Sequence, residues 1–377
     1  MSFSNIGRSL LLGAALLSTA FAPAARAKHY QVLHSFNGGD GSSPNGNLQF
    51  DGAGNLYGTA PEGGSFGHGA IFKLSPAGDF TLAYSFTGGS DGGEPLAGPT
   101  IDPATGDLYG TTASHGANGL GGIFKLTSAG ELVVLHDFKA KPDGDQPTGA
   151  LTRDGKGNLY GTTFQDGSGS SDGTVFELTA DGTFKVLHGL VGGDGAEPIG
   201  RLERHGKDLY GVATIGGSGS GTIFKVTAGG AFTVLHTLTG GVGLGGGMTR
   251  DKAGNLYGTD FSGGLGYVFA LGPSGTWSSL YSFTGGDDGR IPAGDMLLIG
   301  KQLYGAANTG GAAGAFGTIF KLDLQGNFTL LHDFTGPPGD GAQPSGGLVE
   351  GPDGKLYGTP IRGGGHDMGI IFAVSMK

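Results

Sequence analysis

The chain has 377 residues, a formal net charge of −10, 84 glycines and no cysteine. The missing cysteine excludes disulfide bonds, thiol chemistry and zinc sites ligated by cysteine. The acidic balance makes nucleic acid and anionic lipid poor partners, because both carry the same sign of charge. The glycines stand between regularly spaced clusters of Val, Ile, Leu, Phe and Tyr, a pattern typical of short strands joined by tight turns.

Residues 1–27 are predicted to be a secretory signal peptide. Arg8 gives a positive start, an apolar run extends from Leu10 to Ala22, and Ala25 and Ala27 flank a small-residue cleavage site. The run is too short to cross a membrane, and no apolar stretch long enough to do so follows it. A buried N-terminal helix is the alternative. Cleavage after Ala27 removes two arginines and makes the formal net charge −12. We expect a soluble, monomeric protein exported to the periplasm, the cell surface or the medium of a bacterium.

Residues 28–377 are predicted to form one domain from seven copies of a repeat. The clearest copy runs from Asn158 to Leu178 and contains a Leu-Tyr-Gly core that recurs about every 50 residues. The tyrosines of this core are Tyr57, Tyr109, Tyr160, Tyr210, Tyr257, Tyr304 and Tyr357. Self-similarity at such a period indicates a solenoid or a propeller.

Each repeat supplies four strand-like segments: one that follows a proline, the Leu-Tyr-Gly segment, an Ile/Val-Phe segment, and a Val-Leu-His type segment. The copy around Gly245–Asp251 lacks the proline. The exported chain starts with a lone fourth strand, Gln31–Phe36, and its last strand is a third one, Ile371–Val374. The first strand is therefore predicted to complete the last sheet, as in a closed β-propeller. An open solenoid would need atypical capping repeats, and none is visible. The prediction is an all-β, seven-bladed propeller with four-stranded blades.

The run from Asp154 to Thr163, the glycine-rich loop after it, Val175–Leu178 and Lys185–His188 resemble the GloVer-type tandem repeats of exported bacterial proteins. Proteins of that family carry one of several C-terminal surface-sorting segments. The resemblance covers essentially all of residues 28–377 and implies export and a propeller-like array. It supplies no catalytic residues. A weaker likeness, limited to the Asp-x-x-Gly-Asn-Leu-Tyr corner, links the chain to NHL-type and streptogramin-lyase-like propellers.

Strand direction alternates, so the loops that lead into each first strand emerge at the same end as the loops between second and third strands. We call this end the upper face, and propellers usually bind their ligands there. The opposite, lower face carries short turns.

Two columns of the repeat suggest a metal hypothesis. Aspartate followed by glycine recurs in the upper loops, and a ring of carboxylates could attract Ca²⁺. Asp-Gly is also ordinary turn chemistry and calcium-loop spacing is absent, so we prefer the turn and expect no cofactor. Histidine recurs in the fourth strands, but tyrosine replaces it twice, which favours packing over metal ligation. The aspartates are Asp40, Asp91, Asp143, Asp194, Asp288 and Asp340; the histidines are His34, His136, His188, His236 and His332, with Tyr84 and Tyr281 in the remaining copies.

Six residues suggest where a ligand would bind, all of them expected on the upper face. Glu94 and Glu197 precede the proline of two repeats, and two carboxylates could act as acid and base on a glycosidic bond; a solvated polar rim is the alternative. His68, His115 and His366 fall in loops of blades one, two and seven, which ring closure makes consecutive, and Arg362 lies near His366. Titratable groups gathered in one sector are what acid–base chemistry needs, and chance clustering is the alternative.

Two functions remain open from the sequence. One is a binding or scaffold module that presents its upper face to an extracellular polysaccharide or a surface protein. The other is a polysaccharide lyase, glycosidase or lactonase that works at the channel mouth. The absence of any compact catalytic motif favours the binding module.

Overall fold

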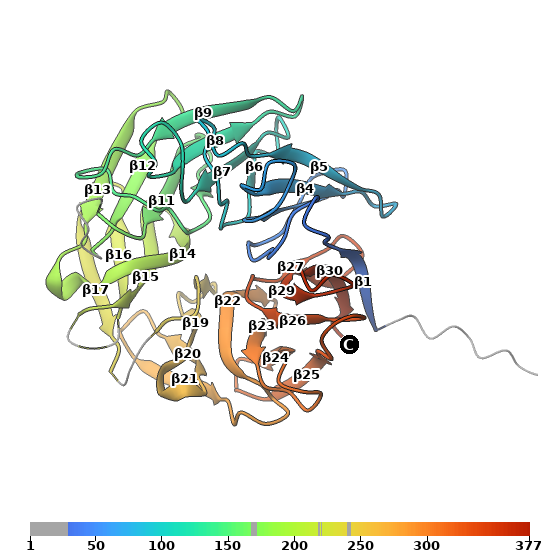
Figure 1. Cartoon of the computed structure of the whole chain (residues 1–377). Coiled ribbons are helices and arrows are strands. Elements are labelled where there is room, and N and C mark those ends of the chain that lie inside the picture. The colour runs from blue at the N-terminus through green and yellow to red at the C-terminus, as the bar shows by residue number, and fades with distance from the viewer. Residues whose placement is uncertain (1–28, 167–171, 218, 220, 240–242) are drawn as a thin grey trace, which may run out of the picture.

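The structure is a computed structural model that describes residues 29–166, 172–217, 219, 221–239 and 243–377. The predicted signal peptide lies outside these residues. Within them, the strands form seven four-stranded antiparallel sheets arranged as the blades of a β-propeller. Figure 1 shows the blades following one another around a ring, with the colour changing steadily from blue to red. The all-β, seven-bladed prediction is confirmed.

Each blade begins at the axis and ends at the rim. The described strands, from inside to outside, are as follows: β2 (Gln49–Phe50), β3 (Leu56–Ala60), β4 (Ala70–Leu74) and β5 (Phe80–Ser85) in blade one; β6 (Thr100–Ile101), β7 (Leu108–Thr112), β8 (Gly122–Leu126) and β9 (Leu132–Asp137) in blade two; β10 (Thr152–Arg153), β11 (Leu159–Thr163), β12 (Thr174–Leu178) and β13 (Phe184–Gly189) in blade three; β14 (Ala196–His205), β15 (Asp208–Ile215), β16 (Thr222–Thr227) and β17 (Phe232–Thr237) in blade four; β18 (Thr249–Arg250), β19 (Leu256–Asp260), β20 (Tyr267–Leu271) and β21 (Trp277–Ser282) in blade five; β22 (Arg290–Ile299), β23 (Gln302–Thr309), β24 (Thr318–Asp323) and β25 (Phe328–Asp333) in blade six; β27 (Val349–Glu350), β28 (Lys355–Gly358), β30 (Ile370–Ser375) and β1 (Tyr30–Ser35) in blade seven.

The sheet of blade seven contains both the first and the last strand of the described chain. β1 pairs antiparallel with β30, from Tyr30 opposite Val374 to Ser35 opposite Ile370, with a bulge between Val32 and His34. In Figure 1, the blue β1 accordingly lies beside the red β30. A smaller two-stranded sheet, β26 (Gly341–Pro344) with β29 (Pro360–Gly363), extends the same blade at its upper end. The only helical turns in the described residues are two short 3-10 segments, η1 (Gly192–Asp194) and η2 (Ser262–Gly264).

The innermost strands differ from the prediction. The proline-led segments were expected to be strands throughout, but in five blades only two residues pair with the next strand, whereas β14 and β22 have ten residues each. At the axis, neighbouring segments approach backbone to backbone. A Cβ on Gly98 would lie 1.6 Å from the carbonyl oxygen of Asn47. The Gly294 N–H donates across the junction to the Gly245 carbonyl at 2.9 Å. These contacts between blades replace pairing within a blade.

The glycine of the Leu-Tyr-Gly core is explained by the phenylalanine of the third strand. Gly58 lies opposite Phe72 in the register of β3 and β4, and a Cβ on Gly58 would meet the Phe72 ring at 2.4 Å. The ring is thereby pressed against the sheet and fully buried. Burying a side chain of this size contributes roughly 1.5–3 kcal/mol. The same pairing recurs in all seven blades, for example between Gly358 and Phe372.

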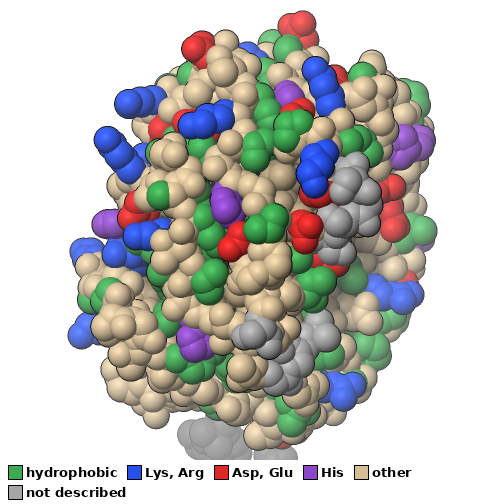
Figure 2. Space-filling model, turned by 90° about the vertical axis from the view of Figure 1, so that its left-hand side faces the viewer, with side chains coloured by type: hydrophobic (Ala, Val, Ile, Leu, Met, Phe, Trp, Pro, Cys, Tyr) green, Lys and Arg blue, Asp and Glu red, His purple; other side chains and the backbone are tan. Residues whose placement is uncertain are grey.

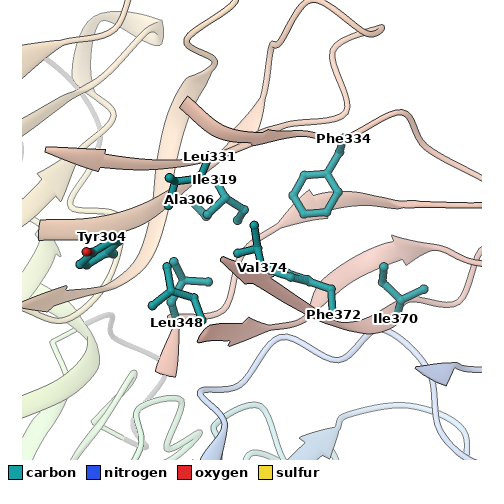
Figure 3. Close-up of a cluster of buried hydrophobic side chains, with 10 residues drawn as sticks. Tyr304, Ala306, Ile319, Leu331, Phe334, Leu348, Ile370, Phe372 and Val374 are labelled. Carbon is teal, nitrogen blue, oxygen red and sulfur yellow. The ribbon is translucent and has the colours of Figure 1, made fainter. Parts of the chain in front are cut away.

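Aliphatic and aromatic side chains fill the space between neighbouring blades. Figure 3 shows the cluster between blades six and seven, in which Phe334 and Leu331 face Phe372, Ile370 and Val374 of β30. The outermost strands add a second contact, because the fourth-strand histidine of one blade stacks on an aromatic ring of the next. His34 stacks on Phe80 with ring centroids 3.6 Å apart, and His332 stacks on Tyr30 in the same way. The packing prediction for this histidine column is confirmed.

The same histidines hold the aspartates of the upper loops. His34 lies 2.9 Å from a carboxylate oxygen of Asp40, and Tyr84 donates to Asp91 where tyrosine replaces histidine. Although burial opposes ionisation, hydrogen bonds from His332 and Tyr30 hold the pKa of Asp340 at about 2. These contacts give the aspartate column a structural role. The other four aspartates of the column pair in the same way with the following residues: Asp143 with His136, Asp194 with His188, Asp288 with Tyr281, and Asp340 with His332 and Thr335.

One side of the ring is mixed in charge. Figure 2 shows the side of the ring that lies at the left of Figure 1, around β13 and β17, and there basic and acidic side chains are interspersed among uncharged ones. Such a side presents no single-signed field for a nucleic acid to follow. Among the described residues, no helix has the length and apolar character needed to cross a membrane.

Candidate functional site

The residue before each first-strand proline sits at a junction between two blades. Its backbone is left-handed in every blade that has this proline, and in five of these blades its N–H donates to a loop carbonyl of the preceding blade, as Glu94 does to His68 at 2.9 Å. A left-handed φ is unfavourable for residues other than glycine, so these residues do not adopt it by preference. The fold imposes this conformation, which lets the N–H group reach the preceding blade. The residues and φ values are Ser43 (56°), Glu94 (54°), Gln146 (50°), Glu197 (55°), Ile291 (57°) and Gln343 (57°).

His68 occupies a position at which four other blades have a large apolar residue, whereas the sequence has Asp172 there in blade three and Ser220 in blade four. The His68 ring covers Gly88 of the facing turn, as Leu265 covers Gly285. The His68 side chain therefore occupies the same place that an apolar packing side chain occupies in blade five. The carbonyl that accepts the junction hydrogen bond belongs to His68 in blade one and to Leu120, Leu265, Phe316 and Met368 in blades two, five, six and seven.

His115 departs from the repeat in a different way. Its carbonyl accepts the N–H of Gly121 at 3.0 Å, and in the other blades with this hydrogen bond the acceptor is a glycine: Gly63, Gly216, Gly310 or Gly363. All four glycines have φ between 71° and 99°, and His115 keeps the left-handed value of 62°. A side chain here costs backbone strain of about 1 kcal/mol or more, which is a reason to ask what the imidazole contributes.

The two histidines meet. Their ring centroids are 4.6 Å apart and the rings are inclined at 69°, edge to face. Both side chains lie over Gly93, where a Cβ would come within 2.8 Å of Nδ1 of His115. That nitrogen also lies 2.6 Å from the Ser114 hydroxyl. Glu94, next to Gly93, is exposed. We call His68, His115 and Glu94 the junction site; the sequence predicted all three in one sector.

Phe66 adds an exposed aromatic ring to the same loop. It lies two residues before His68 and is 60% exposed, the largest exposure of any aromatic side chain among the described residues. The repeat does not require an aromatic side chain there, since the loop is glycine-rich on both sides. No sequence motif points to it as a binding residue.

The other predicted site residues have different partners. His366 is exposed, and Arg362 forms an exposed ion pair with Asp367 at 2.7 Å. Within the described ranges, no hydrogen bond or ring contact joins either residue to the two histidines of the junction site. Glu197 stands at the junction into blade four, where its carbonyl accepts a hydrogen bond from the Thr214 hydroxyl at 3.1 Å. Its side chain belongs to another sector, so the structure does not pair it with Glu94.

A second polar cluster, which sequence reasoning missed, crosses the propeller axis. The Asn47 amide of blade one donates to Asp295 of blade six, and the Gly247 N–H donates to the other carboxylate oxygen. The Gly347 N–H donates to the Asn47 side chain at 2.7 Å. Burial raises the pKa of Asp295, opposed by its hydrogen bonds and by the charge of Arg201.

One column of the repeat carried a signal for this cluster. Four blades have a small residue in the column and three have a charge or an amide. Small residues leave space at the axis, so the polar side chains of the other three blades can reach across it. The column reads Asn47, Gly98, Ala150, Arg201, Gly247, Asp295 and Gly347 around the ring.

Asn47, Arg201 and Asp295, which we call the axial plug, divide the channel. Above them lies a cavity of about 240 Å³, to whose lining every blade contributes a glycine. Below them lies a cavity of about 620 Å³, lined by the innermost strands of six blades. All three plug residues line both cavities. In the part of the chain that the structure describes, no group of three or more His, Asp or Glu side chains is arranged to hold a metal ion.

Comparison with known proteins identifies a family and a fold. The model of the Gloeobacter/Verrucomicrobia repeat matches residues 13–220 and 208–377, which confirms the resemblance seen in the sequence. No curated protein sequence matches the chain. Among solved structures, a chain of a nidogen/laminin complex is similar with 20% identity and a TM-score of 0.46, over 64% of this chain and 80% of that one. A luciferin-regenerating enzyme is similar with 15% identity and a TM-score of 0.48, over 71% and 84%. Similarity at this level carries no functional argument.

Proposed function

The chain belongs to the Gloeobacter/Verrucomicrobia repeat family, and we propose that it is an exported binding module that recognises an extracellular glycan through the junction site on its upper face. The observation that carries this proposal is the meeting of His68 and His115. His68 departs from the large apolar residue that four other blades have in its column, and His115 departs from the glycine of five other blades. Blade three also departs at these positions, with Asp172 and Asp166, but among the described residues of these two columns only the two histidines form a ring contact, and His115 does so against backbone strain. Two independent departures that produce a contact are better explained by a ligand than by folding.

The chemistry of the junction site suits a sugar. Imidazole nitrogens donate and accept hydrogen bonds, and the exposed Glu94 carboxylate accepts them from hydroxyl groups. The exposed Phe66 ring offers a flat apolar surface for the C–H face of a sugar ring. A polymer could extend from this site over the glycine-rich loops, whose lack of side chains leaves room for it.

An enzyme acting on the same polymer is the second candidate. The adjacent imidazoles and carboxylate are groups that transfer protons, as a lyase, glycosidase or lactonase would require. The edge-to-face contact of His68 and His115 is the observation that favours it. Retention of a polysaccharide without new chain ends would support binding alone, whereas new reducing or unsaturated ends would support catalysis.

Reversion of each histidine to the residue of its own repeat column provides the test. His68→Leu and His115→Gly should each weaken retention on immobilised polysaccharides at least tenfold, and Glu94→Gln should weaken it less. Because leucine and glycine are what the fold accepts elsewhere, neither variant should lower the melting temperature, and His115→Gly should leave the free energy of unfolding unchanged or raise it by up to about 1 kcal/mol.

Glu197→Gln is the matched control, since Glu197 has the same junction backbone in another sector. Retention of neutral and acidic polysaccharides is measured by affinity electrophoresis, and melting by differential scanning fluorimetry. Unchanged retention in all four variants, loss in the control alone, or no retention by the native protein would contradict the proposal.

A further inference from the structure

We infer that the lower cavity of the channel is a second binding site, separate from the junction site, that takes a neutral sugar of one or two rings. The cavity holds about 620 Å³, within the range of roughly 300–1,000 Å³ that small-molecule sites occupy. It lies on the lower side of the axial plug, among the innermost strands of six blades.

Strand alternation decides which side chains face this cavity. Leu48, Leu202 and Met296 are buried in the core between blades, so the residues on either side of them point to the axis. The axis-facing residues below the plug are therefore Gln49, Thr152, Glu203, Thr249, Leu297 and Val349, and all of them line the cavity.

The axis-facing side chains below the plug are polar on one side of the channel and apolar on the other, although Glu350 of blade seven also lines the cavity on the apolar side. Blades one, three, four and five contribute Gln49, Thr152, Glu203 and Thr249, whereas the neighbouring blades six and seven contribute Leu297 and Val349. A sugar has the same division, with hydroxyl groups around its edge and C–H groups on its face. A hydrated ion could not form hydrogen bonds with the apolar side chains, and an apolar ligand would leave the polar side chains without hydrogen-bond partners.

Several polar groups on this wall have capacity left for a ligand. The Gln49 carbonyl oxygen accepts the Ile101 N–H at 3.1 Å, which leaves its amide N–H groups available. The Thr152 hydroxyl donates to the Leu202 carbonyl and can still accept. Among the described residues, no hydrogen bond joins the side chain of Glu203 or Thr249 to another group. A half-buried carboxylate and hydroxyl that face a cavity are suited to pair with ligand hydroxyls.

Charge at the site favours a neutral ligand. Burial and the charge of Asp295 disfavour the ionised form of Glu203, and the charges of Arg201 and Arg250 offset this only in part. Asp295 is held by Asn47 and the Gly247 N–H. A cation in the cavity would meet Arg201 and Arg204, and an anion would meet Glu203, Asp295 and Glu350, because all five residues line it.

Ligand-detected saturation-transfer NMR with D-glucose, D-galactose, maltose and lactose tests this inference on the exported chain. At least one of the four should receive saturation from the native protein. Glu203→Gln and Thr249→Val, which change hydrogen bonding but hardly the volume, should each raise its Kd fivefold or more.

Two control variants are needed. One shows whether weaker binding comes only from lower stability, and the other shows whether it comes from the junction site and not from this cavity. Thr100 occupies the column of Thr249 in blade two, but its hydroxyl donates to the Leu151 carbonyl and it does not line the cavity; Thr100→Val should lower stability and leave the Kd unchanged. His68→Leu should also leave the Kd unchanged, because it alters the junction site alone. Absence of transfer from all four sugars, a loss in Thr100→Val as large as in Thr249→Val, or a loss in His68→Leu alone would overturn the inference.

Discussion

At the scale of single residues, the side chains of both candidate sites belong to positions at which one blade differs from most of the others. Many columns repeat one residue type around the ring, because every blade must solve the same packing problem. His68, His115 and Asp295 differ from most members of their columns. The two histidines meet on the upper face, and Asp295 reaches across the channel. We therefore propose that departures from the internal repeat mark binding residues in this chain.

Glu203 should make the stability of the protein depend on pH in a defined window. Burial raises its pKa from 4.5 to about 6, although Arg201 and Arg250 act in the opposite direction. The folded state therefore holds the proton more tightly than the unfolded state. Stability falls as the pH rises from 4.5 to 6, and the full loss from the ionisation of Glu203 persists above that window.

Glu203→Gln removes the ionisation and should raise the free energy of unfolding at pH 8 by about 1 kcal/mol, after allowance for partial exposure to solvent. At pH 4 the variant and the native protein should be nearly equal. Urea unfolding at the two pH values measures this difference, with the exposed Glu131→Gln as the control. A gain that is the same at both pH values would show that the carboxylate charge is not its cause.

At the scale of elements, the strands could be predicted because each is fixed by its own sequence. The second, third and fourth strands have their hydrophobic pattern written seven times, and the structure places them as expected. The inner segments could not be predicted in this way. Their pairing is decided by neighbouring backbones at the axis, such as Gly98 against Asn47, and no local pattern records that distance.

The same reasoning applies to the candidate sites. His68 and His115 lie in consecutive blades, so counting blades was enough to predict that they are neighbours. Asn47 and Asp295 are 248 residues apart, and their hydrogen bond depends on how far two side chains reach across the channel. The sequence shows which residues share a column, but it does not show how wide the channel is and hence which side chains can meet across it. The histidine column of the outer strands and the aspartate column of the upper loops were likewise predicted separately. Only the structure shows that a histidine and an aspartate of the same blade form a pair, as His34 and Asp40 do.

The N-terminal strand should be essential to the ring. β1 provides the outer strand of blade seven, and Phe36 just after it is fully buried against Leu48, Leu56 and Phe72 of blade one. A chain that begins at Asn37 should leave the edge of β30 unpaired and open to other chains. We expect aggregation or a fall in melting temperature of about 10 °C or more, on the order of the several kcal/mol that a buried aromatic and a strand contribute.

A chain that begins at His29 is the control for this deletion, because it keeps β1 and its neighbours. Size-exclusion chromatography with light scattering reports association, and calorimetry reports the melting temperature. If the shorter chain remains monomeric and as stable as the control, the pairing of β1 with β30 does not hold the ring together.

At the scale of the whole molecule, the folded domain begins almost directly after the predicted signal peptide. The first described residue, His29, is already anchored to two blades. Its ring lies 2.9 Å from the Leu331 carbonyl of blade six, and its own carbonyl accepts the Ser375 N–H of blade seven at 2.8 Å. Cleavage after Ala27 would thus leave one residue, Lys28, ahead of the first anchored position.

The exported form is therefore predictable to the residue. When the full-length chain is produced in a bacterium, intact mass spectrometry of the periplasmic or secreted protein should find Lys28 at the N-terminus, because cleavage follows the second small residue of the site. Recovery of exported protein that still carries Met1 would refute the signal peptide.

The two alanines of the cleavage site give a sharper test of export. Replacing Ala25 and Ala27 by aspartate should block cleavage and leave the protein with the membrane fraction, because the processing site requires small side chains. Asn37→Asp, at an exposed position of the folded domain, is the control and should be exported and cleaved normally, since an added negative charge outside the site does not hinder processing. Western blotting of membrane, periplasmic and secreted fractions distinguishes the processed from the unprocessed chain. Normal cleavage of the double variant, or native protein found only in the cytoplasm, would remove the signal peptide and with it the extracellular setting of both proposed sites.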